Sequence, residues 1–470
     1  MKRLIAGIRG IKSTLYLWLL APQYLKRDSH DRHGQLIETT EREVFGDGGI
    51  VESEAHEVCE LRRLVRRTLA QFLCQRKLIG SPFVLALRQS VYGVSVLPLL
   101  ATLVWRSWRD RHNSPNDAKR HGIVVFFLAE RLKESIGPNS FPEEHYLLRK
   151  PSVRLGLAEI SFLLRTVFHC PRFLRYPELL VNAIRWTCYY GFVVRNFAPH
   201  TVVHFFESTA SSSLMTAYLH QFQIRHIDIQ HGERWHTADA AFSAFDEIHV
   251  WGEYFRNVFV WQKSHATAIL VKGHRGHDAL YNDIRPRNQP RRQRLLIIDP
   301  YIYGRQTYDY DALVRVLYEL DSSWDVRIRR HPFDRREELE CLEALQSETS
   351  LSDRGITIVE EPPSEVSIHE ALASTRVVIG ITSAAMIDSW IAGCKVIHLP
   401  SVAAPQGFML RYQESHNVWY ADDTEGVGSF LREPVELSDD EAGRIDYVTR
   451  VLPPSRDNHL EQPLSRLKSA

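Results

Sequence analysis

Short runs of consecutive apolar residues recur along most of the chain beyond residue 120. They are too short for typical helices, and a continuous run such as Ile123–Leu128 is the pattern of a strand buried on both faces of a parallel sheet. The first group of predicted strands comprises Ile123–Leu128, Val202–Phe206, Ile224–Ile229, Glu247–Trp251 and Ala268–Val271. The second group comprises Leu295–Ile298, Trp324–Ile328, Ile356–Val359, Val377–Ile379 and Lys395–Leu399.

Amphipathic segments separate these runs, among them Leu155–Phe168, Ser212–Gln221, Asp311–Leu320 and Ala384–Ala392. Short apolar strands that alternate with helices predict a parallel sheet. We therefore expect an α/β fold with two Rossmann-like, doubly wound units that face a cleft. The carboxyl ends of the strands should border that cleft, because ligands bind there in such folds.

The same pattern predicts the domain organisation. Residues 1–120 read as a mainly helical N-terminal region, 121–284 as a first Rossmann-like domain and 295–470 as a second. Residues 285–294 are polar and basic and contain two prolines, so we expect an interdomain linker with nothing that is easily buried. A solvated loop within one domain is the alternative.

Composition agrees with a folded protein of two or three domains, since the chain has 470 residues, 44% hydrophobic and 24% charged. The net charge of +1 argues against strong steering towards nucleic acid. Six cysteines show neither CxxC nor zinc-ligand spacing, which favours reduced buried thiols and a cytoplasmic location.

Two apolar segments bear on membrane contact. Met1–Lys26 is basic, but its apolar part, Leu15–Leu20, is too short to cross a bilayer. Val91–Trp105 is interrupted by a glycine and a proline and is followed by arginines at 106, 109 and 111. A helix at a lipid surface has this pattern, and so does a buried helix with a basic end. We favour the buried helix, and leave open a peripheral contact with the inner face of a membrane.

A basic cluster, Arg329-Arg330-His331-Pro332, directly follows a predicted strand and should therefore face the cleft. Two guanidinium groups and an imidazole suit a phosphate or pyrophosphate, and the proline fixes the turn. A second cluster runs from Gly380 through Thr382, Ser383 and Ala384 to Asp388, between a strand and a helix. There, hydroxyl groups and the N–H groups of the helix start can hold a phosphate, and Asp388 can reach ribose hydroxyls. A basic surface turn and a simple helix cap are the alternatives.

The opposite wall of the cleft has its own candidates. Gln230-His231-Gly232-Glu233 follows a strand of the first domain, and His231 is our candidate general base. Glu207, at the end of another strand, is the rival catalytic residue. Segments 251–253 and 272–278 give weaker signals. Asp309 and Asp311 have the spacing of a metal-binding DxD, but helix capping explains them more simply, so we expect no obligatory metal.

Taken in order, Arg329–Pro332, Ser383–Asp388 and Gly393–Val396 resemble the donor half of GT-B glycosyltransferases of bacterial capsule synthesis, such as capsular Kdo transferases and bacterial sialyltransferases. Gln230–Gly232 is similar to the histidine-glycine element of CDP-glycerol glycerophosphotransferases. The resemblance extends over 202–399. Two positions depart from the family pattern: the usual Glu-Ala is Asp388-Ser389, and the hydroxyl pair is Thr382-Ser383.

The resemblance implies a metal-independent glycosyltransferase with a nucleotide-activated donor, CMP or CDP ahead of UDP, and no other cofactor. His331, Thr382 and Ser383 would hold the donor phosphate, and His231 would act on the acceptor. The acceptor would be a surface polysaccharide or its lipid-linked precursor. The alternatives are transfer of a polyol phosphate from a CDP carrier, and a non-catalytic assembly protein of the same shape.

Overall fold

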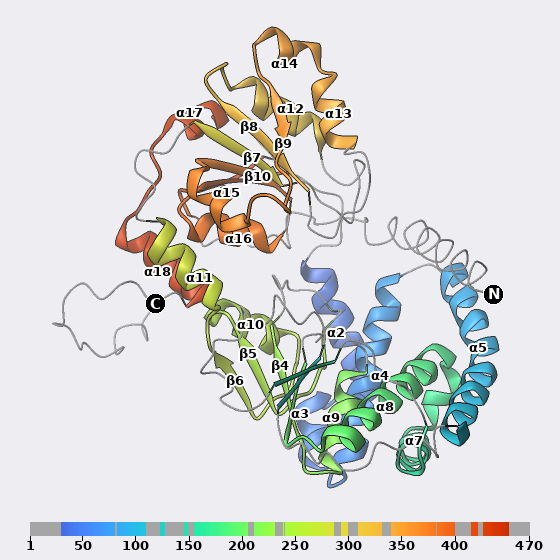
Figure 1. Ribbon diagram of the computed structural model, residues 1–470. Coiled ribbons are helices and arrows are strands. Elements are labelled where there is room, and N and C mark those ends of the chain that lie inside the picture. The colour runs from blue at the N-terminus through green and yellow to red at the C-terminus, as the bar shows by residue number, and fades with distance from the viewer. Residues whose placement is uncertain are drawn as a thin grey trace, which may run out of the picture.

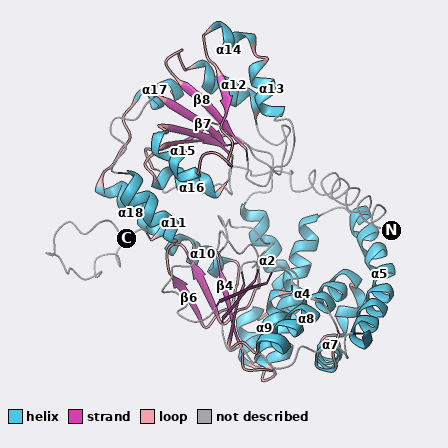
Figure 2. Cartoon of the chain, viewed as in Figure 1, coloured by secondary structure: helices cyan, strands magenta, loops and turns pink. Residues whose placement is uncertain are grey.

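Two six-stranded parallel sheets, each flanked by helices, make up the two α/β units of the computed structural model (Figure 1 and Figure 2). The structure describes residues 30–79, 82–109, 123–126, 145–148, 155–204, 211–230, 238, 240–285, 293–298, 309–330, 340–381, 383–399, 415–421 and 426–450. The predicted fold class, with two Rossmann-like units and a helical N-terminal region, is confirmed.

The first sheet has the strand order β2-β1-β3-β4-β5-β6. Its strands are β1 (Ile123–Phe126), β2 (His145–Leu148), β3 (Thr201–His204), β4 (Arg225–Ile229), β5 (Glu247–Val250) and β6 (Ala268–Val271). All neighbours are parallel. The five predicted strands of this unit are present, and β2 is an additional edge strand that the sequence pattern did not indicate.

The second sheet has the order β12-β11-β10-β7-β8-β9. Its strands are β7 (Arg294–Ile298), β8 (Asp325–Arg329), β9 (Ile358–Glu360), β10 (Val377–Gly380), β11 (Lys395–His398) and β12 (Val418–Tyr420). Counted along the chain, this is the 3-2-1-4-5-6 order of dinucleotide-binding folds. The chain reverses its direction of winding between β7 and β10, the two central strands.

Helices cover both sheets. Those of the first unit are α7 (Leu157–His169), η2 (Pro171–Arg175), α8 (Pro177–Phe197), α9 (Ser212–His220), α10 (Glu253–Trp261), α11 (Arg275–Ala279) and η3 (Leu280–Ile284). After β7 follow α12 (Tyr310–Tyr318), α13 (Glu340–Gln346), α14 (Thr349–Asp353), α15 (Ile368–Ser374), α16 (Ala384–Ile391), α17 (Val427–Arg432) and α18 (Asp439–Thr449). All six cysteines are free thiols, and all but Cys59 are buried.

The N-terminal helices are α2 (His30–Phe45), α3 (Gly49–Ala55), α4 (Glu60–Ile79) and α5 (Pro82–Arg109). They are part of the first unit's core, because α4 packs along α9 and buries Leu64 and Leu69 in one apolar cluster with Leu214 and Leu219. Removing these helices would therefore expose the apolar face of α9 to water.

The expectation of a buried helix at 91–105 is wrong. This segment belongs to α5, which lies at the edge of the first unit against α8 (Figure 1). Val91, Val94 and Leu97 are 56%, 78% and 75% exposed. α8 covers one side of α5, so only residues such as Val84 and Leu103 are buried. Among the described residues, Phe83–Leu103 of α5 is the one helical segment long and apolar enough to cross a membrane.

The two units also share a core. Phe255 and Phe259 of α10 lie in one apolar cluster with Met386 and Trp390 of α16 and with Val448 of α18. α18, which ends the described chain, packs on α10 and so returns to the first unit (Figure 1).

The first residue of the expected linker also differs from expectation. Arg285 is 6% exposed, and its guanidinium group lies over the ring of Tyr281. Because the aliphatic part and the guanidinium group of Arg285 both contact other residues, burying this side chain costs less free energy than burying an isolated charge.

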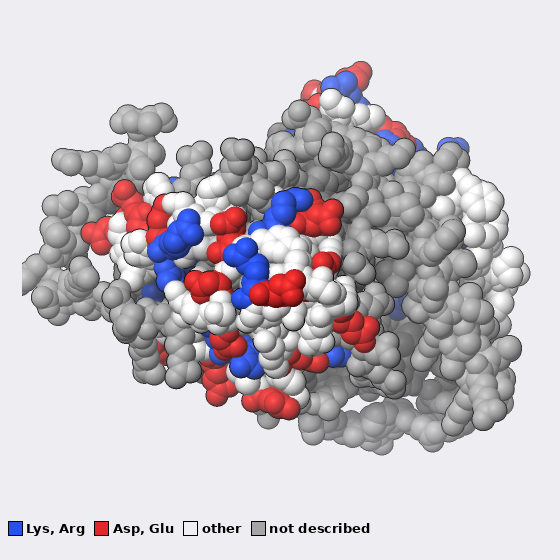
Figure 3. All heavy atoms as spheres, turned by 90° about the horizontal axis from the view of Figure 1, so that it is seen from above, with Lys and Arg blue, Asp and Glu red and all other residues white. Residues whose placement is uncertain are grey.

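Basic and acidic side chains are interspersed on the described part of the face shown in Figure 3, in agreement with the small net charge.

Candidate functional site

The carboxyl ends of β7 and β10 meet where the second sheet reverses its winding. In open parallel sheets, ligands bind in the crevice outside the strand ends at such a point. Gly380 ends β10 there. A Cβ atom at residue 380 would lie 2.8 Å from Sδ of Met386 and 3.3 Å from Cβ of Ile298. A side chain at residue 380 would require Met386 and the end of β7 to shift, so glycine suits the close packing of this turn.

Ser383 begins α16 as its N-cap residue. Its backbone is extended, and its hydroxyl oxygen accepts a hydrogen bond from the N–H of Ala385 at 3.3 Å. Ala384 is the first helical residue. The cap satisfies one N–H group of the first turn, and the others are the groups that bind anions at helix starts. Thr382 lies outside the described residues.

The two arginines that follow β8 both have protein partners. Arg329 is 6% exposed, donates to the carbonyl of Val366 at 2.8 Å and lies 3.4 Å from a carboxylate oxygen of Glu361. Arg330 donates from Nε and Nη2 to the two oxygens of Glu360, at 2.5 and 3.0 Å. This bidentate pair is the strong arrangement for an arginine and a carboxylate.

These contacts join the carboxyl ends of β8 and β9, since Glu360 ends β9 and Glu361 follows it. Arg294 also forms an ion pair with Glu361, which therefore faces two guanidinium groups. A phosphate at this strand end would share the arginines with carboxylates. That Arg329 and Arg330 hold a donor phosphate stays a prediction, and His331 and Pro332 lie outside the described residues.

His398 lies beside Gly380, and sequence reasoning missed it. The two residues are register partners in β11 and β10, and the N–H of Leu399 donates to the carbonyl of Gly380 at 2.8 Å. The imidazole stacks on the ring of Tyr420. Burial lowers the pKa of His398 to about 3, so it is uncharged at neutral pH. The position of His398 at the end of a predicted strand could have identified it as a candidate site residue.

The candidate nucleotide helix α16 is held from the first unit. Nε2 of His277, which is almost fully buried, lies 3.2 Å from Oδ1 of Asp388. Arg285 directs Nη1 at the carbonyl groups of Trp390 and Ile391, at 3.4 Å each. A cation at this end of a helix is favourable, because the last carbonyl groups carry partial negative charge. Asp388 thus has a partner in the first unit, and its predicted contact with ribose stays a prediction.

An aromatic cluster forms the first unit's side of this junction. The ring of Trp251 lies 5.4 Å from that of His274 and 4.9 Å from that of His277. Burial, together with the nearby His277, lowers the pKa of His274 to about 3. The weakly indicated segments 251–253 and 272–278 therefore lie in the contact between the units.

On the first unit, Gln230 joins two strand ends. It is 2% exposed, its side-chain oxygen accepts a hydrogen bond from the N–H of Trp251 at 3.0 Å, and its own N–H donates to the carbonyl of His249. Gln230 therefore fixes the ends of β4 and β5. The other candidates on this side, Glu207, His231, Gly232 and Glu233, lie outside the described residues.

A buried acid near these strand ends was missed by the sequence reasoning. Asp228 in β4 has no exposed surface, and neither carboxylate oxygen has a hydrogen-bond partner among the described residues. Burial raises its pKa well above the usual range. Nδ1 of His204 lies 3.8 Å away, and burial lowers the pKa of His204 to about 3. His204 is therefore uncharged at neutral pH, and burial favours the uncharged form of Asp228.

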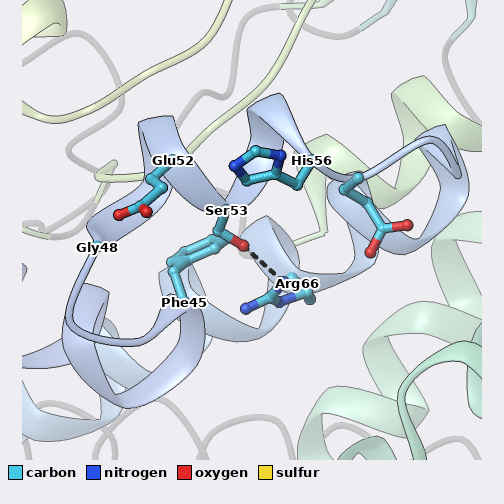
Figure 4. Close-up of a pocket in the computed structure, with 7 residues that line it drawn as sticks. Phe45, Gly48, Glu52, Ser53, His56 and Arg66 are labelled. Atoms are coloured by element: carbon cyan, nitrogen blue, oxygen red, sulfur yellow. Dashed lines mark hydrogen bonds between the residues drawn. The ribbon is translucent and has the colours of Figure 1, made fainter.

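Two further candidates concern metals and cavities. The carboxylate of Asp309 caps α12 by accepting from the N–H of Ala312 at 2.9 Å, which supports capping as the role of this DxD. Within the described residues, no group of three His, Cys, Asp or Glu side chains could hold a metal. An open hollow of about 410 Å³ lies among α2, α3 and α4, where Arg66 donates to the hydroxyl of Ser53 (Figure 4). It is far in sequence from every candidate residue above.

Comparison with known proteins gives a likeness of fold. No model of a protein family and no curated protein sequence matches the chain. Among solved structures, S. aureus MnaA with UDP is 11% identical at a TM-score of 0.42, covering 71% of this chain and 93% of that chain. The UDP-GlcNAc 2-epimerase of Neisseria meningitidis bound to UDP-GlcNAc is 10% identical at 0.42, covering 70% and 97%.

The wall teichoic acid polymerase TagF is 12% identical at a TM-score of 0.37, and the match covers 78% of this chain and 93% of that chain. Identities and TM-scores this low assign neither a substrate nor a reaction to this chain. What it does must therefore be argued from its own residues.

Proposed function

We propose that this chain is a metal-independent GT-B glycosyltransferase that binds a nucleotide-activated sugar at the carboxyl ends of β7 and β10. The acceptor is a surface polysaccharide or its lipid-linked precursor, and the first unit binds it, with His231 as general base. The donor carries CMP or CDP in preference to UDP. The turn from Gly380 to Ser383 supports this proposal most directly, because it combines a close strand contact, a capped helix start and the point where the winding reverses.

The surrounding charges suit a phosphate group there. Arg329 and Arg330 lie at the end of β8, next to β7, and bring positive charge to the same edge of the sheet. His398 is uncharged beside Gly380, so it adds a polar group without competing as a cation. His277, which pairs with Asp388, and Arg285 keep α16 in place from the first unit, so that the helix start is fixed before a ligand arrives.

Nucleotide binding by matched serine variants tests the site. Ser383 caps α16, and Ser438 caps α18 in the same way, accepting from the N–H of Glu441 at 3.3 Å. Ser383→Ala and Ser438→Ala should each cost about 1 kcal/mol of stability. Only Ser383→Ala should also weaken binding of CMP or CDP, by about tenfold, through the lost hydrogen bond to phosphate.

Isothermal titration calorimetry with CMP, CDP, UDP and GDP provides the measurement. Binding of none of them would overturn the proposal and favour the non-catalytic assembly protein. Equal losses of affinity in the two variants would show that the nucleotide phosphate does not bind at the start of α16. A donor labelled in both its sugar and its phosphate then separates the two reactions, because a polyol-phosphate transferase moves the phosphate label to the acceptor and a glycosyltransferase does not.

A further inference from the structure

The outer side of α5 carries a stripe of large apolar side chains. At about 100° per residue, its members fall in one sector of the helix, opposite Leu103, which is buried. Their exposure ranges from 37% to 78%. The stripe consists of Phe83, Leu87, Val91, Val94, Leu97 and Trp105. Single exposed apolar residues are common on proteins, but a contiguous patch of this kind marks a binding surface.

α7 widens this surface. Ile160 and Leu163 of α7 pack with Leu99 and Leu100 of α5 around one apolar cluster. Leu157, Leu164 and Phe168 of α7 are 82%, 66% and 78% exposed, and by helical spacing they lie next to the side of α7 that meets α5. The two exposed stripes, on helices that share this cluster, are together called the α5–α7 face, and both helices lie at the edge of the first unit (Figure 1).

The charged residues of α5 are all basic. α5 contains no acidic residue, and Arg88, which is paired with Glu178, lies on its inner side. The helix ends with Arg106 and Arg109. In the sequence, the first 27 residues contain six basic residues and no acidic one: Lys2, Arg3, Arg9, Lys12, Lys26 and Arg27. An exposed apolar stripe on a helix whose charged residues are all basic is complementary to a bilayer with anionic headgroups.

We propose that the α5–α7 face docks this protein on the surface of a membrane that contains anionic lipid, with α5 parallel to the bilayer plane. α5 is long enough to span, but spanning would pull Val84 and Leu103, at its two ends, out of their contacts with the rest of the first unit. A second copy of the chain would place two α5 helices, whose charged residues are all basic, against each other. The inference rests on this surface alone and does not depend on the proposed function.

Flotation of the full chain with vesicles tests the proposal. The protein should float with vesicles of phosphatidylcholine and phosphatidylglycerol in equal parts, and much less with phosphatidylcholine alone. Val94→Asp combined with Leu97→Asp should lower the vesicle partition coefficient at least about 100-fold, because two aliphatic side chains no longer enter the lipid. Val94→Ser combined with Leu97→Ser should lower it similarly, although the net charge is unchanged.

Val51→Asp combined with Val260→Asp is the matched control, since these valines are 80% and 59% exposed but lie on α3 and α10, which are not part of the face. This variant should float like the wild type. Circular dichroism and thermal unfolding must show that all variants fold. The proposal is overturned if the wild type fails to float, if the control loses as much as the α5 variants, or if membrane-bound protein resists extraction with carbonate, as a spanning helix would. It is also overturned if the chain dimerises without lipid and the α5 variants are monomeric.

Discussion

Gly252 stands where the last helix returns to the first unit. It is the N-cap residue of α10, and its φ of −150° is accessible to any amino acid. A Cβ atom there would lie 2.2 Å from the carbonyl carbon and oxygen of Val448 and 2.6 Å from the carbonyl oxygen of Tyr447. These are backbone atoms of α18, so they cannot move aside as a flexible side chain can. We therefore predict that Gly252→Ala displaces α18 from α10.

The cost follows from what α18 buries. A local shift that relieves the overlap should cost about 1–3 kcal/mol, as overpacking does elsewhere. Full detachment would relieve the overlap but expose Ile445 and Val448, which are completely buried, and would instead cost about 1.5–3 kcal/mol for each. The loss of stability should therefore lie between about 1 and 6 kcal/mol, depending on how far the helix moves.

Gly443→Ala is the control within the same helix. Gly443 is exposed in the middle of α18, and its Cβ atom would meet nothing within 4 Å. This change should stabilise the helix by up to about 1 kcal/mol. Calorimetric unfolding gives the stability, and hydrogen exchange of the α18 amides shows where it changes. If Gly252→Ala left both the midpoint and the α18 protection as in the wild type, the close approach of α10 and α18 described here would be refuted.

Two further predictions concern pH. Hydrogen bonds from His220 to Asp246 and Glu60 raise the pKa of His220, so their stabilisation is complete below the ordinary pKa of 6.5 and is lost as the pH rises through the raised value. His220→Gln should therefore destabilise the protein most near pH 6, with a smaller difference from wild type near pH 9, measured by denaturant unfolding at both pH values. The buried Asp228 has a raised pKa, so its folded form loses stability as the pH rises above about 4. Asp228→Asn should be more stable than the wild type at neutral pH and equal to it near pH 4 in thermal unfolding, and equal stability at both would contradict the assigned protonation.

Much of the second unit could be predicted from the sequence. Its central strands are uninterrupted apolar runs bounded by charged residues or glycine, and the predicted limits of β10 and β11 differ from the structure by one residue at most. Such strands are buried on both faces, so the local pattern and the fold agree. Strands β2 and β12 were missed because His145–Leu148 and Val418–Tyr420 are short edge strands without that pattern.

The partners of the candidate residues could not be predicted in the same way. Asp388 and His277 are far apart in the sequence, and their contact depends on how the two units pack. The pairing of Arg330 with Glu360 was partly predictable, since each residue lies at the end of a predicted strand. Predicting it, however, also required knowing that these two strands are neighbours in the sheet. The exposure of α5 could not be predicted, because its length and apolar composition do not distinguish a buried helix from a surface helix.

The return of α18 to the first unit means that the chain passes between the units twice. It crosses once after Arg285 and again before Asp439. Because the chain connects the units at two points, the units can rotate relative to each other only about an axis that passes through both connections. They also predict that a single proteolytic cut at the basic segment 287–292 will not release either half, because α18 still ties the distal fragment to α10. After a second cut, between α17 and α18, only the contacts of α16 with the first unit would still join the halves.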